Sequence, residues 1–584
     1  MSKDNLTVAY FDAEMRYLRE AAQEYADLFP ERARALNLDR PGALDSSVEQ
    51  LFQGFAFLMG RLREKLDDDL PEVTEGLIDW VRPQFMRLIP SLCIVEFSPD
   101  IHQMKIGETV RKGFEVRSQP IGPHRVRCRY TTTQDLTLRG LALDTVQVAQ
   151  SADGRSVISL GFSRGNLLPW DAMALQDIPL YLNASAPVAT ALHQALTLGV
   201  HTVYLRSGNS DRAVLDVHFA AKGFGDADRL WPEVESRSGG CRLLMEYFSF
   251  PEKFMFVTLR GLEHGRFDAH SKTFVIDVVL DQPWPRPFPL GPEHIRLHAV
   301  PVINLFALEA EPLTLDPIQS DYRVRPLESQ DGHTEIYSVD SVVAVKHTER
   351  QAYASFTCFQ HRAKGAPERY FHTRLQRAPN GLHDTWLILS GEGFDIDRSN
   401  SAQRLSLQLT GTHGHLPRMA LAKAVLDTPA HAPRRALNVR NLCPPTMPCY
   451  PPEGGRFHWR VLSHLGSNFL PMLDSAEVLR NTLTLYDWSD SEQNRRRLQA
   501  IVDVHHHLIE RFEKGFLKRG VGIEINLDAA AFVGEGDISL FGEMLSRFFA
   551  QYADIHLFNQ LTLVVQPQAT CLRWPERHSE RVPG

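Results

Sequence analysis

The sequence lacks the features of an exported or membrane-spanning protein. Its first residues, MSKDNLTVAYFDAEM, contain neither the basic start nor the apolar stretch of a secretory signal. No apolar run approaches the length of about 18 residues that a spanning helix needs. The seven cysteines are odd in number, widely spaced and without a C-x-x-C pair, which argues against a disulfide framework and a zinc knuckle. We therefore expect a cytoplasmic protein that does not insert directly into a membrane.

Neither sign of charge is in large excess. The chain has 63 Lys and Arg residues against 71 Asp and Glu residues, a formal charge of −8, which argues against nucleic-acid binding through bulk charge. One basic run stands out, residues 495–497, followed by Arg511, Lys514, Lys518 and Arg519. Because the whole chain is acidic, this run fits a solvated helix face or a surface for an acidic partner better than a nucleic-acid site.

Motifs of catalysis are missing or incomplete. The sequence has no P-loop and no Rossmann glycine fingerprint. Residues 161–165, GFSRG, match the G-x-S-x-G pattern around a serine nucleophile, Ser163, but residues 166–169 resemble a turn where a nucleophile elbow needs a helix. Two close carboxylate pairs occur, Glu309 with Glu311 and Asp395 with Asp397. At this sequence spacing they are more typical of loops than of a glycosidase site. We predict no catalytic residue, no cofactor and no enzymatic activity.

A histidine run gives the most metal-like pattern. We predict a helix over residues 494–514, in which His506 and Glu510 lie four residues apart on one face, as two metal ligands would. His505 and His507 point in other directions, however, and the H-E-x-x-H pattern is absent. We interpret the run as a solvated or partner-facing cluster that binds no metal.

The beginning of the chain is predicted to be helical. Apolar residues recur at helical spacing over 6–28 and 46–66, and a third helix follows the acidic residues 67–69, with Pro71 near its first turn. These helices carry more apolar surface than they can hide among themselves. Two interpretations stay open: the helices pack on the rest of the chain, or they form a bundle with partner chains.

From residue 92 onward the apolar period changes from 3.6 to 2, which predicts strands. The predicted fold class is α+β, multidomain and β-rich, with several β-sandwich-like or mixed domains after the N-terminal helical segment. Further helices are expected near 187–197, 472–486 and 536–551, in addition to 494–514. The predicted regions are 1–90 (helical), 91–250 (β-rich), 251–345 (β-rich), 346–440 (β-rich), 441–456 (a Pro/Gly linker) and 457–584 (α/β).

Residues 242–262, RLLMEYFSFPEKFMFVTLRGL, form the most informative stretch of the chain. Its first part is apolar and short, and fits either a helix or a strand. Pro251 has no N–H group and a fixed φ angle, so this first element should end before it. Residues 254–257 then form a continuous apolar run typical of a strand buried on both faces. The stretch is predicted to join two core elements through a hinge.

The pattern L-x-x-E-Y-F-x-F-P-E-K-F, followed by G-L, resembles the TssF family, also called ImpG or VasA. Similar matches occur at residues 300–306 (VPVINLF), 336–342 (IYSVDSV) and 459–465 (WRVLSHL). The chain departs from the family pattern at residues 410–415 and at Pro317. The resemblance marks as structural or interface candidates Glu246, Tyr247, Phe248, Pro251, Glu252, Asn304, Phe306, Tyr337, Asp340, His464 and Arg519.

Members of this family are baseplate subunits of type VI secretion systems, so the resemblance implies a scaffold similar to contractile-phage wedge proteins. The implied partners are TssG-like and TssK-like proteins, the sheath-linking subunit TssE, the VgrG spike and a second copy of the chain. The baseplate would dock at the inner-membrane complex through those partners, start sheath and tube assembly, and transmit the contraction trigger. Two alternatives stay open: a wedge protein of a phage-like contractile particle, and a β-rich carbohydrate-active enzyme.

Overall fold

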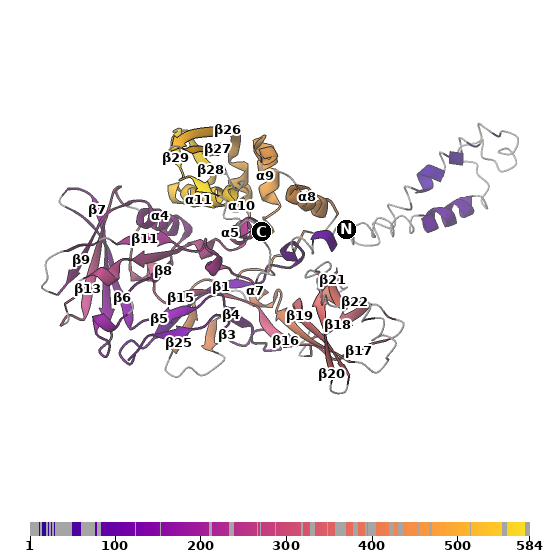
Figure 1. Cartoon of the computed structure of the whole chain (residues 1–584), viewed down its shortest axis with the longest axis horizontal. Helices are drawn as coiled ribbons and strands as arrows, with labels where there is room; N and C mark the ends of the chain where they lie inside the picture. Colours follow the sequence, from indigo (N-terminus) through magenta and orange to yellow (C-terminus); the bar gives the residue numbers. More distant parts are fainter. Residues whose placement is uncertain are drawn as a thin grey trace. The chain divides into compact units, whose positions relative to one another are not determined.

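The computed structural model divides the chain into two compact units, Met1–Arg82 with Pro452–Gly466, and Pro83–Pro451 with Ser467–Gly584. Figure 1 shows the chain, with its elements labelled. The structure describes residues 11, 14–18, 21–22, 25, 29, 49–59, 76–78, 83–122, 124–151, 153–173, 175–208, 213–215, 217–232, 239–265, 267–268, 270–285, 288–316, 319, 321–327, 333–346, 349–356, 369–377, 383–391, 394, 404–419, 425–429, 437–452, 455–466, 470–513, 516–551 and 557–578.

The described residues of the first unit are mostly helical. Residues 14–18, 49–59 and 76–78 have helical conformation, within the three helices predicted from apolar spacing. The rest of those predicted helices lies outside the described residues. The unit also includes helix α8 (Gly455–Gly466), which carries His464 in its last turn.

A six-stranded sheet forms the centre of the second unit. Its strand order is β24-β3-β4-β15-β1-β25. Strand β1 is buried over its first six residues, and both of its edges are paired: Ile94 lies opposite Pro301 and Val95 opposite Asn441. The sheet therefore takes strands from three of the regions delimited by sequence. Its strands are β1 (Leu92–Pro99), β3 (Glu115–Ser118), β4 (Arg129–Thr132), β15 (Ala299–Ile303), β24 (Leu426–Pro429) and β25 (Leu437–Asn441).

The segment 441–451, part of the predicted linker, lies along β1. The Leu92 N–H donates to Thr446 Oγ1 at 2.9 Å, and the Cys93 thiol donates to the carbonyl of Cys443 at 3.1 Å. Ile89 and Cys449 form an isolated β-bridge. The prolines between these contacts have no N–H group, so no backbone donor is left without a partner at their positions. The extended segment lies close to β1.

Two further sheets, of five and four strands, stand beside the central one. In the first, β7 pairs with β13 and β6, and Gly161 faces a bulge of β6, where a Cβ atom would lie 2.2 Å from Thr145 Oγ1. Helix α4 (Ala186–Thr197) confirms the helix predicted at 187–197. The five-stranded sheet consists of β6 (Leu141–Gln150), β7 (Ser156–Arg164), β9 (Val200–Ser207), β10 (Ala213–Leu215) and β13 (Thr273–Leu280). The four-stranded sheet consists of β8 (Ile178–Leu182), β11 (His218–Ala221), β12 (Phe256–Arg260) and β14 (Ile295–Arg296).

An eight-stranded sheet has its own apolar core, which includes Leu387, Leu405 and Leu409. Strand β19 pairs with β23 through two irregularities, and β23 shows the alternation of buried and exposed residues expected of a half-buried strand. The strands are β16 (Phe306–Glu309), β17 (Leu313–Thr314), β18 (Asp321–Val324), β19 (Glu335–Lys346), β20 (Glu349–Ser355), β21 (Tyr370–Arg377), β22 (His383–Ser390) and β23 (Arg404–Thr412). A separate pair joins β2 (Glu108–Val110) to β5 (Leu136–Leu138).

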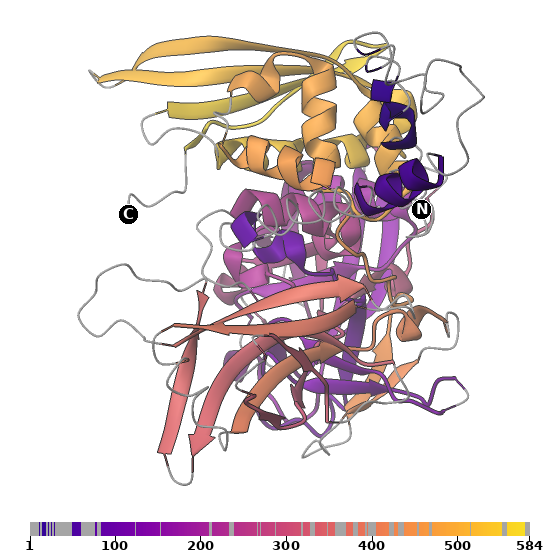
Figure 2. The same ribbon diagram turned by 90° about the vertical axis from the view of Figure 1, so that its right-hand side faces the viewer.

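The C-terminal part of the second unit combines helices with a five-stranded sheet. Strands β27 and β28 are parallel, and helix α11 connects them and buries most of its residues. Strands β26 and β27 form a long antiparallel arm at one edge of this sheet, which Figure 2 shows in side view. The elements are α9 (Ala476–Thr484), α10 (Glu492–Gln499), β26 (Ile501–Glu513), β27 (Phe516–Asp528), α11 (Glu535–Ala550), β28 (Leu557–Gln566), β29 (Thr570–Arg573) and β30 (Arg577–His578).

Candidate functional site

Helix α5 (Gly239–Ser249) holds the centre of the most informative sequence stretch. Its residues 242–248 are all buried, which decides in favour of a helix where the sequence left helix and strand open. The helix ends before Pro251, as predicted, and a short 3-10 turn, Pro251–Phe254, follows. This turn reverses the chain, so that Lys253 reaches back to Glu246.

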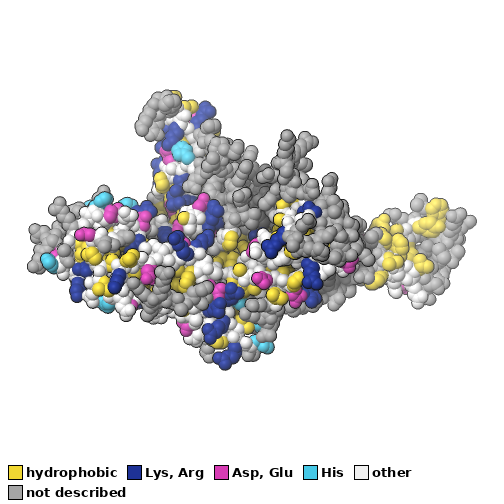
Figure 3. Space-filling view, turned by 60° about the horizontal axis from the view of Figure 1, so that its bottom comes forward, with side chains coloured by type: hydrophobic (Ala, Val, Ile, Leu, Met, Phe, Trp, Pro, Cys, Tyr) yellow, Lys and Arg dark blue, Asp and Glu magenta, His cyan; other side chains and the backbone are white. Residues whose placement is uncertain are grey.

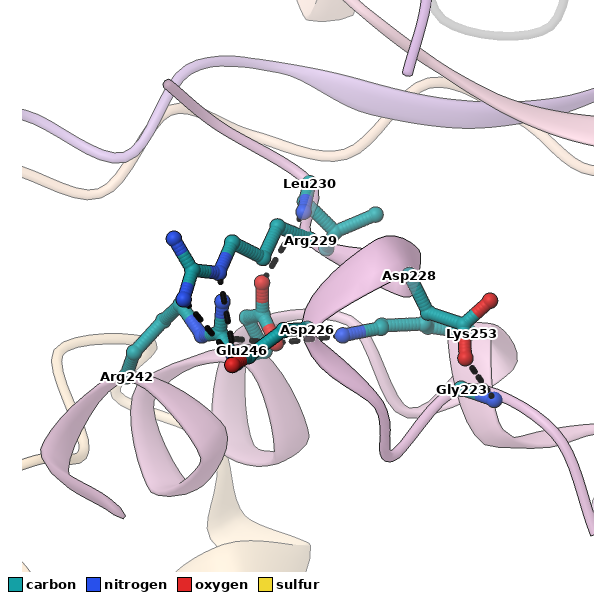
Figure 4. A network of polar contacts seen from close by, with 8 residues as sticks. All are labelled: Gly223, Asp226, Asp228, Arg229, Leu230, Arg242, Glu246 and Lys253. Carbon is teal, nitrogen blue, oxygen red and sulfur yellow. Dashed lines mark hydrogen bonds and ion pairs between the residues drawn. The ribbon is translucent and has the colours of Figure 1, made fainter. Parts of the chain in front are cut away.

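Glu246 and Lys253 form an ion pair inside the protein (Figure 4), since their side chains are 0% and 1% exposed. The second carboxylate oxygen of Glu246 accepts a hydrogen bond of 3.0 Å from the N–H of Leu230. The guanidinium of Arg242, one helical turn earlier, lies 3.9 Å from the same carboxylate. Burial lowers the pKa of Lys253, and the charge of Glu246 opposes that change.

The network fixes the loop of residues 223–230, which follows β11. Arg242 donates to Asp226 at 3.1 Å, and the carboxylate of Asp228 accepts from the N–H of Gly223 at 3.1 Å. Burial would raise the pKa of Asp226, but its contacts with Arg229 and Arg242 lower it. The candidates that the family pattern marks in the sequence include Glu246, but not Arg242, Asp226 or Lys253. The sequence contains one signal for the pairing of Lys253, because this lysine lies among the aromatic residues of the F-P-E-K-F run. A charge in such an apolar environment is stable only when it is paired.

The same helix is tied to the C-terminal part of the chain. The amide of Asn494 on α10 donates to the Phe248 carbonyl at 2.9 Å. Arg497 binds Asp537 of α11 at 2.7 Å and lies over the ring of Tyr247, 5.7 Å from its centroid. Helix α5 therefore joins elements that are about half the chain apart in sequence.

A second buried network surrounds Asn304, which is 0% exposed. Its amide nitrogen donates to the Arg129 carbonyl at 2.7 Å and lies 3.1 Å from His413 Nδ1. Its amide oxygen accepts from the Thr412 hydroxyl at 2.8 Å and from the His413 N–H at 2.7 Å. The ring of Phe306 contacts both the Arg129 guanidinium, 4.6 Å from its centroid, and the His413 imidazole, at a centroid distance of 4.5 Å and a tilt of 37°. The network joins the central sheet to β23, and it uses residues of the segment 410–415, where the chain departs from the family pattern.

Replacing Asn304 by Leu is expected to lower the free energy of unfolding by at least about 3 kcal/mol, because several buried donors and acceptors lose their partner. The matched control is Asn438→Leu, at an exposed position of β25. That substitution should change stability by no more than about 0.5 kcal/mol. Chemical denaturation of both variants measures the difference, and equal values would contradict the role assigned to Asn304.

Comparison with known proteins decides the family. A family model described as type VI secretion system, TssF, matches residues 3–581. The chain belongs to the TssF family. A curated relative, type VI secretion system component TssF1 of Pseudomonas aeruginosa, is 26% identical over 624 residues, with 98% of each chain covered.

Two solved structures resemble this TssF-family chain. A chain of the TssK-TssF-TssG baseplate subcomplex of a type VI secretion system is 50% identical, with a TM-score of 0.83, and the match covers 92% of this chain and 100% of that one. A chain of the baseplate complex from a type VI secretion system is 47% identical, with a TM-score of 0.69, and the match covers 99% and 100%. The β-rich, multidomain fold predicted from sequence is confirmed.

The other candidates of this TssF-family chain lie apart from the two networks. The Arg87 guanidinium lies over the ring of Tyr337 on β19, 5.6 Å from the ring centroid. The Asp340 carboxylate accepts a hydrogen bond of 2.6 Å from the Thr410 hydroxyl. Arg519 on β27 pairs with Glu510 across the arm at 3.0 Å. Burial raises the pKa of Glu252, which follows Pro251 in the 3-10 turn. Their role at an interface stays a prediction.

The prediction of a helix over residues 494–514 is wrong from Ile501 onward. Helix α10 ends at Gln499, and β26 begins at Ile501 and includes the three histidines. Most of β26 from His505 onward is exposed on both faces, so no apolar alternation marked it as a strand; pairing with β27 overrides the local pattern. Within the described residues no group of His, Cys, Asp or Glu side chains could hold a metal ion.

The remaining motifs have structural explanations. Ser163 lies inside strand β7 and not at a turn from strand to helix, and Gly161, two residues earlier, is required by the β6 bulge. Of the basic run, Arg496 pairs with Glu492 on the surface and Arg497 is buried against Asp537. No helix in the described part of the chain is long and apolar enough to cross a membrane.

Proposed function

We propose that this chain is a structural subunit of a type VI secretion baseplate and assembles there with TssK-like and TssG-like proteins. The support is the extent of its likeness to a chain of the TssK-TssF-TssG subcomplex, which is 50% identical and covers 92% of this chain. Catalysis plays no part in the proposal: the polar networks around Glu246 and Asn304 join elements of the chain to one another.

One observation carries the assembly role. The helical residues 49–59 present large apolar side chains at i, i+4 and i+7, the spacing of one helix face: Leu51 is 72% exposed, Phe55 50% and Leu58 67%. Hydrophobic side chains crowd the surface of this segment, at the right-hand end of Figure 3. A stripe of this kind is the pattern by which an amphipathic helix enters a bundle or a groove of another chain. We infer that this stripe packs against helices of the partner proteins.

The finer roles extend the same proposal. The chain would contact a TssE-like sheath-linking subunit and the VgrG spike, pair with a second copy of itself, and reach the inner-membrane complex only through partners. Its part in contraction would be mechanical: helix α5 links distant segments through buried contacts, so a displacement at one surface is passed on to others rather than absorbed.

Replacing Leu51 and Leu58 by Glu is expected to abolish co-purification with the TssG-like and TssK-like proteins while leaving the unfolding transition of the second unit unchanged. Charges placed in a buried helix interface prevent packing, whereas both side chains are mostly exposed in the isolated chain. The test is co-expression, affinity capture and native mass determination.

Leu198→Glu provides the matched control, since Leu198 is 69% exposed at the end of α4 and far from the N-terminal stripe in sequence. The control should co-purify like the unchanged chain. If the unchanged chain itself ignores both partners, the baseplate proposal fails. If the double variant still assembles, the baseplate role stands and the placement of the interface on this stripe is wrong.

A further inference from the structure

A cavity of about 620 Å³ opens beside the loop that the α5 network holds. It lies between residues of β5, β8, β11, β12, β15 and α11, and its volume is within the range of about 300–1,000 Å³ typical of ligand sites. Seven charged side chains line it, four basic and three acidic: Arg139, Lys222, Arg260, Arg547, Asp135, Asp177 and Asp228. A lining of this polarity fits a charged occupant.

The acidic side chains of the cavity are already engaged by the protein. Asp177 binds the Arg260 guanidinium at 2.7 Å. Asp135 accepts from the backbone N–H of Lys112 at 2.7 Å, and Asp228 accepts from that of Gly223. Among the bases, Arg547 binds Glu543 at 2.5 Å. These pairs leave one cation of the lining poorly compensated.

That cation is Lys222, which directly follows strand β11. Its side chain is 25% exposed, and the nearest carboxylate oxygen, of Asp228, is 3.9 Å from its ammonium nitrogen. This separation is too long for a hydrogen bond, and within the described residues the ammonium makes none. Burial lowers the pKa of Lys222, Asp228 and Asp177 oppose the change, and the nearby charge of Arg139 lowers it further. An anion beside Lys222 would give its ammonium group the hydrogen-bond acceptor that it lacks among the described residues.

We propose that this cavity receives an acidic loop of a partner protein, with an Asp or Glu carboxylate bound between Lys222 and Arg139. The inference rests on the proposed assembly role and names a second contact for it, in the β-rich unit. A loop fits better than a simple ion, because the cavity is many times the roughly 30 Å³ that one water occupies. The partner loop would complete a buried charge pair, an arrangement that favours one partner over others.

The cavity wall is built for a defined shape. Phe224, Gly225 and Asp228 belong to the loop anchored by Glu246 and Arg242, and Arg547 lies over the Phe224 ring at 4.5 Å from its centroid. Gly223, at φ +103°, has no room for a side chain, since a Cβ atom would lie 2.7 Å from the Lys253 carbonyl. The buried network and the cavity are thus parts of one construction.

Pulse acetylation with acetic anhydride near neutral pH, read by mass spectrometry, tests the proposal in the full chain. Lys222 should be acetylated in the isolated chain and protected at least about tenfold in the complex with the TssG-like and TssK-like proteins, because a bound carboxylate keeps it protonated and covered. Exposed Lys105 should react equally in both. Unchanged labelling of Lys222 in a complex that has formed would overturn the proposal.

Two further measurements separate the alternatives. Lys222→Glu should weaken complex formation at least about tenfold, the lower end for loss of a buried charge pair, and Lys105→Glu should not. Thermal unfolding of both variants checks that they remain folded. If millimolar inorganic phosphate protects Lys222 as fully as the partners do, the cavity is a free-anion site and the partner loop is excluded. If no complex forms with the unchanged chain, it is the assembly role that fails.

Discussion

Replacing Lys253 by Met is expected to lower the free energy of unfolding by about 3–5 kcal/mol, the range measured when one partner of a buried ion pair is removed. Met occupies nearly the volume of the lysine stem, so the packing around Phe254 survives. The carboxylate of Glu246, 0% exposed, loses its closest counter-charge and keeps Arg242 only at 3.9 Å. Chemical denaturation measures the loss, and hydrogen exchange at the Leu230 amide should locate it.

A double variant separates charge from packing. In Glu246→Gln with Lys253→Met, the Gln oxygen still accepts from the Leu230 N–H and neither position carries a buried charge, while Arg242 keeps its pair with Asp226 at 3.1 Å. The pair of changes should therefore cost less than Lys253→Met alone. The control is Arg111→Met, which breaks an ion pair whose side chains are 81% and 52% exposed and should cost no more than about 1 kcal/mol. A Lys253→Met cost as small as the control's would contradict the buried pair.

Acidification is expected to destabilise the protein steeply below pH 6.5, because three buried histidines stay neutral in the folded state. Burial lowers the pKa of His298 to about 3, that of His413 to about 3 and that of His193 to about 4. The unfolded chain protonates each near 6.5, so it binds more protons than the folded chain as the pH falls. Each histidine then removes about 1.4 kcal/mol of stability per pH unit between 6.5 and its folded pKa.

The geometry explains why these rings resist protonation. The Arg139 N–H donates to His298 Nε2 at 3.0 Å, which leaves that nitrogen an acceptor. His413 Nδ1 lies 3.1 Å from the Asn304 amide nitrogen, a contact of the same kind. Measuring the free energy of unfolding against pH should give a slope near three protons around pH 5. His298→Asn should lower that slope by about one proton, whereas His264→Gln, at a side chain 80% exposed, should leave it unchanged.

Local patterns were enough to predict many elements. The change of the apolar period from 3.6 to 2 predicted β1, helices were expected at the positions of α4 and α11, and Pro251 marked the end of α5. Each of these signals depends only on residues within one short segment. The boundary between α10 and β26 was missed because a strand exposed on both faces carries no alternation, and its hydrogen bonds to β27 are what make it a strand.

The candidate site was predictable only in part. The family pattern pointed to Glu246 and Asn304, and both proved to be centres of buried networks. Their partners could not be read from the sequence, because Leu230 and His413 are 16 and 109 residues away from them. The cavity could not be predicted from the sequence, because its lining residues are spread from Gln134 to Arg547 and only folding brings them together.

The position of β1 has a consequence for how the protein is made. Strand β1 is paired on one edge by β15 and on the other by β25, and Cys93 contacts Cys443, 350 residues later in the chain. At roughly 5–20 residues per second, synthesis leaves the β25 edge of this mostly apolar strand open for roughly 20–70 seconds. An open strand edge is one that neighbouring chains can join. Fragments ending before residue 437 lack β25 and keep this edge open.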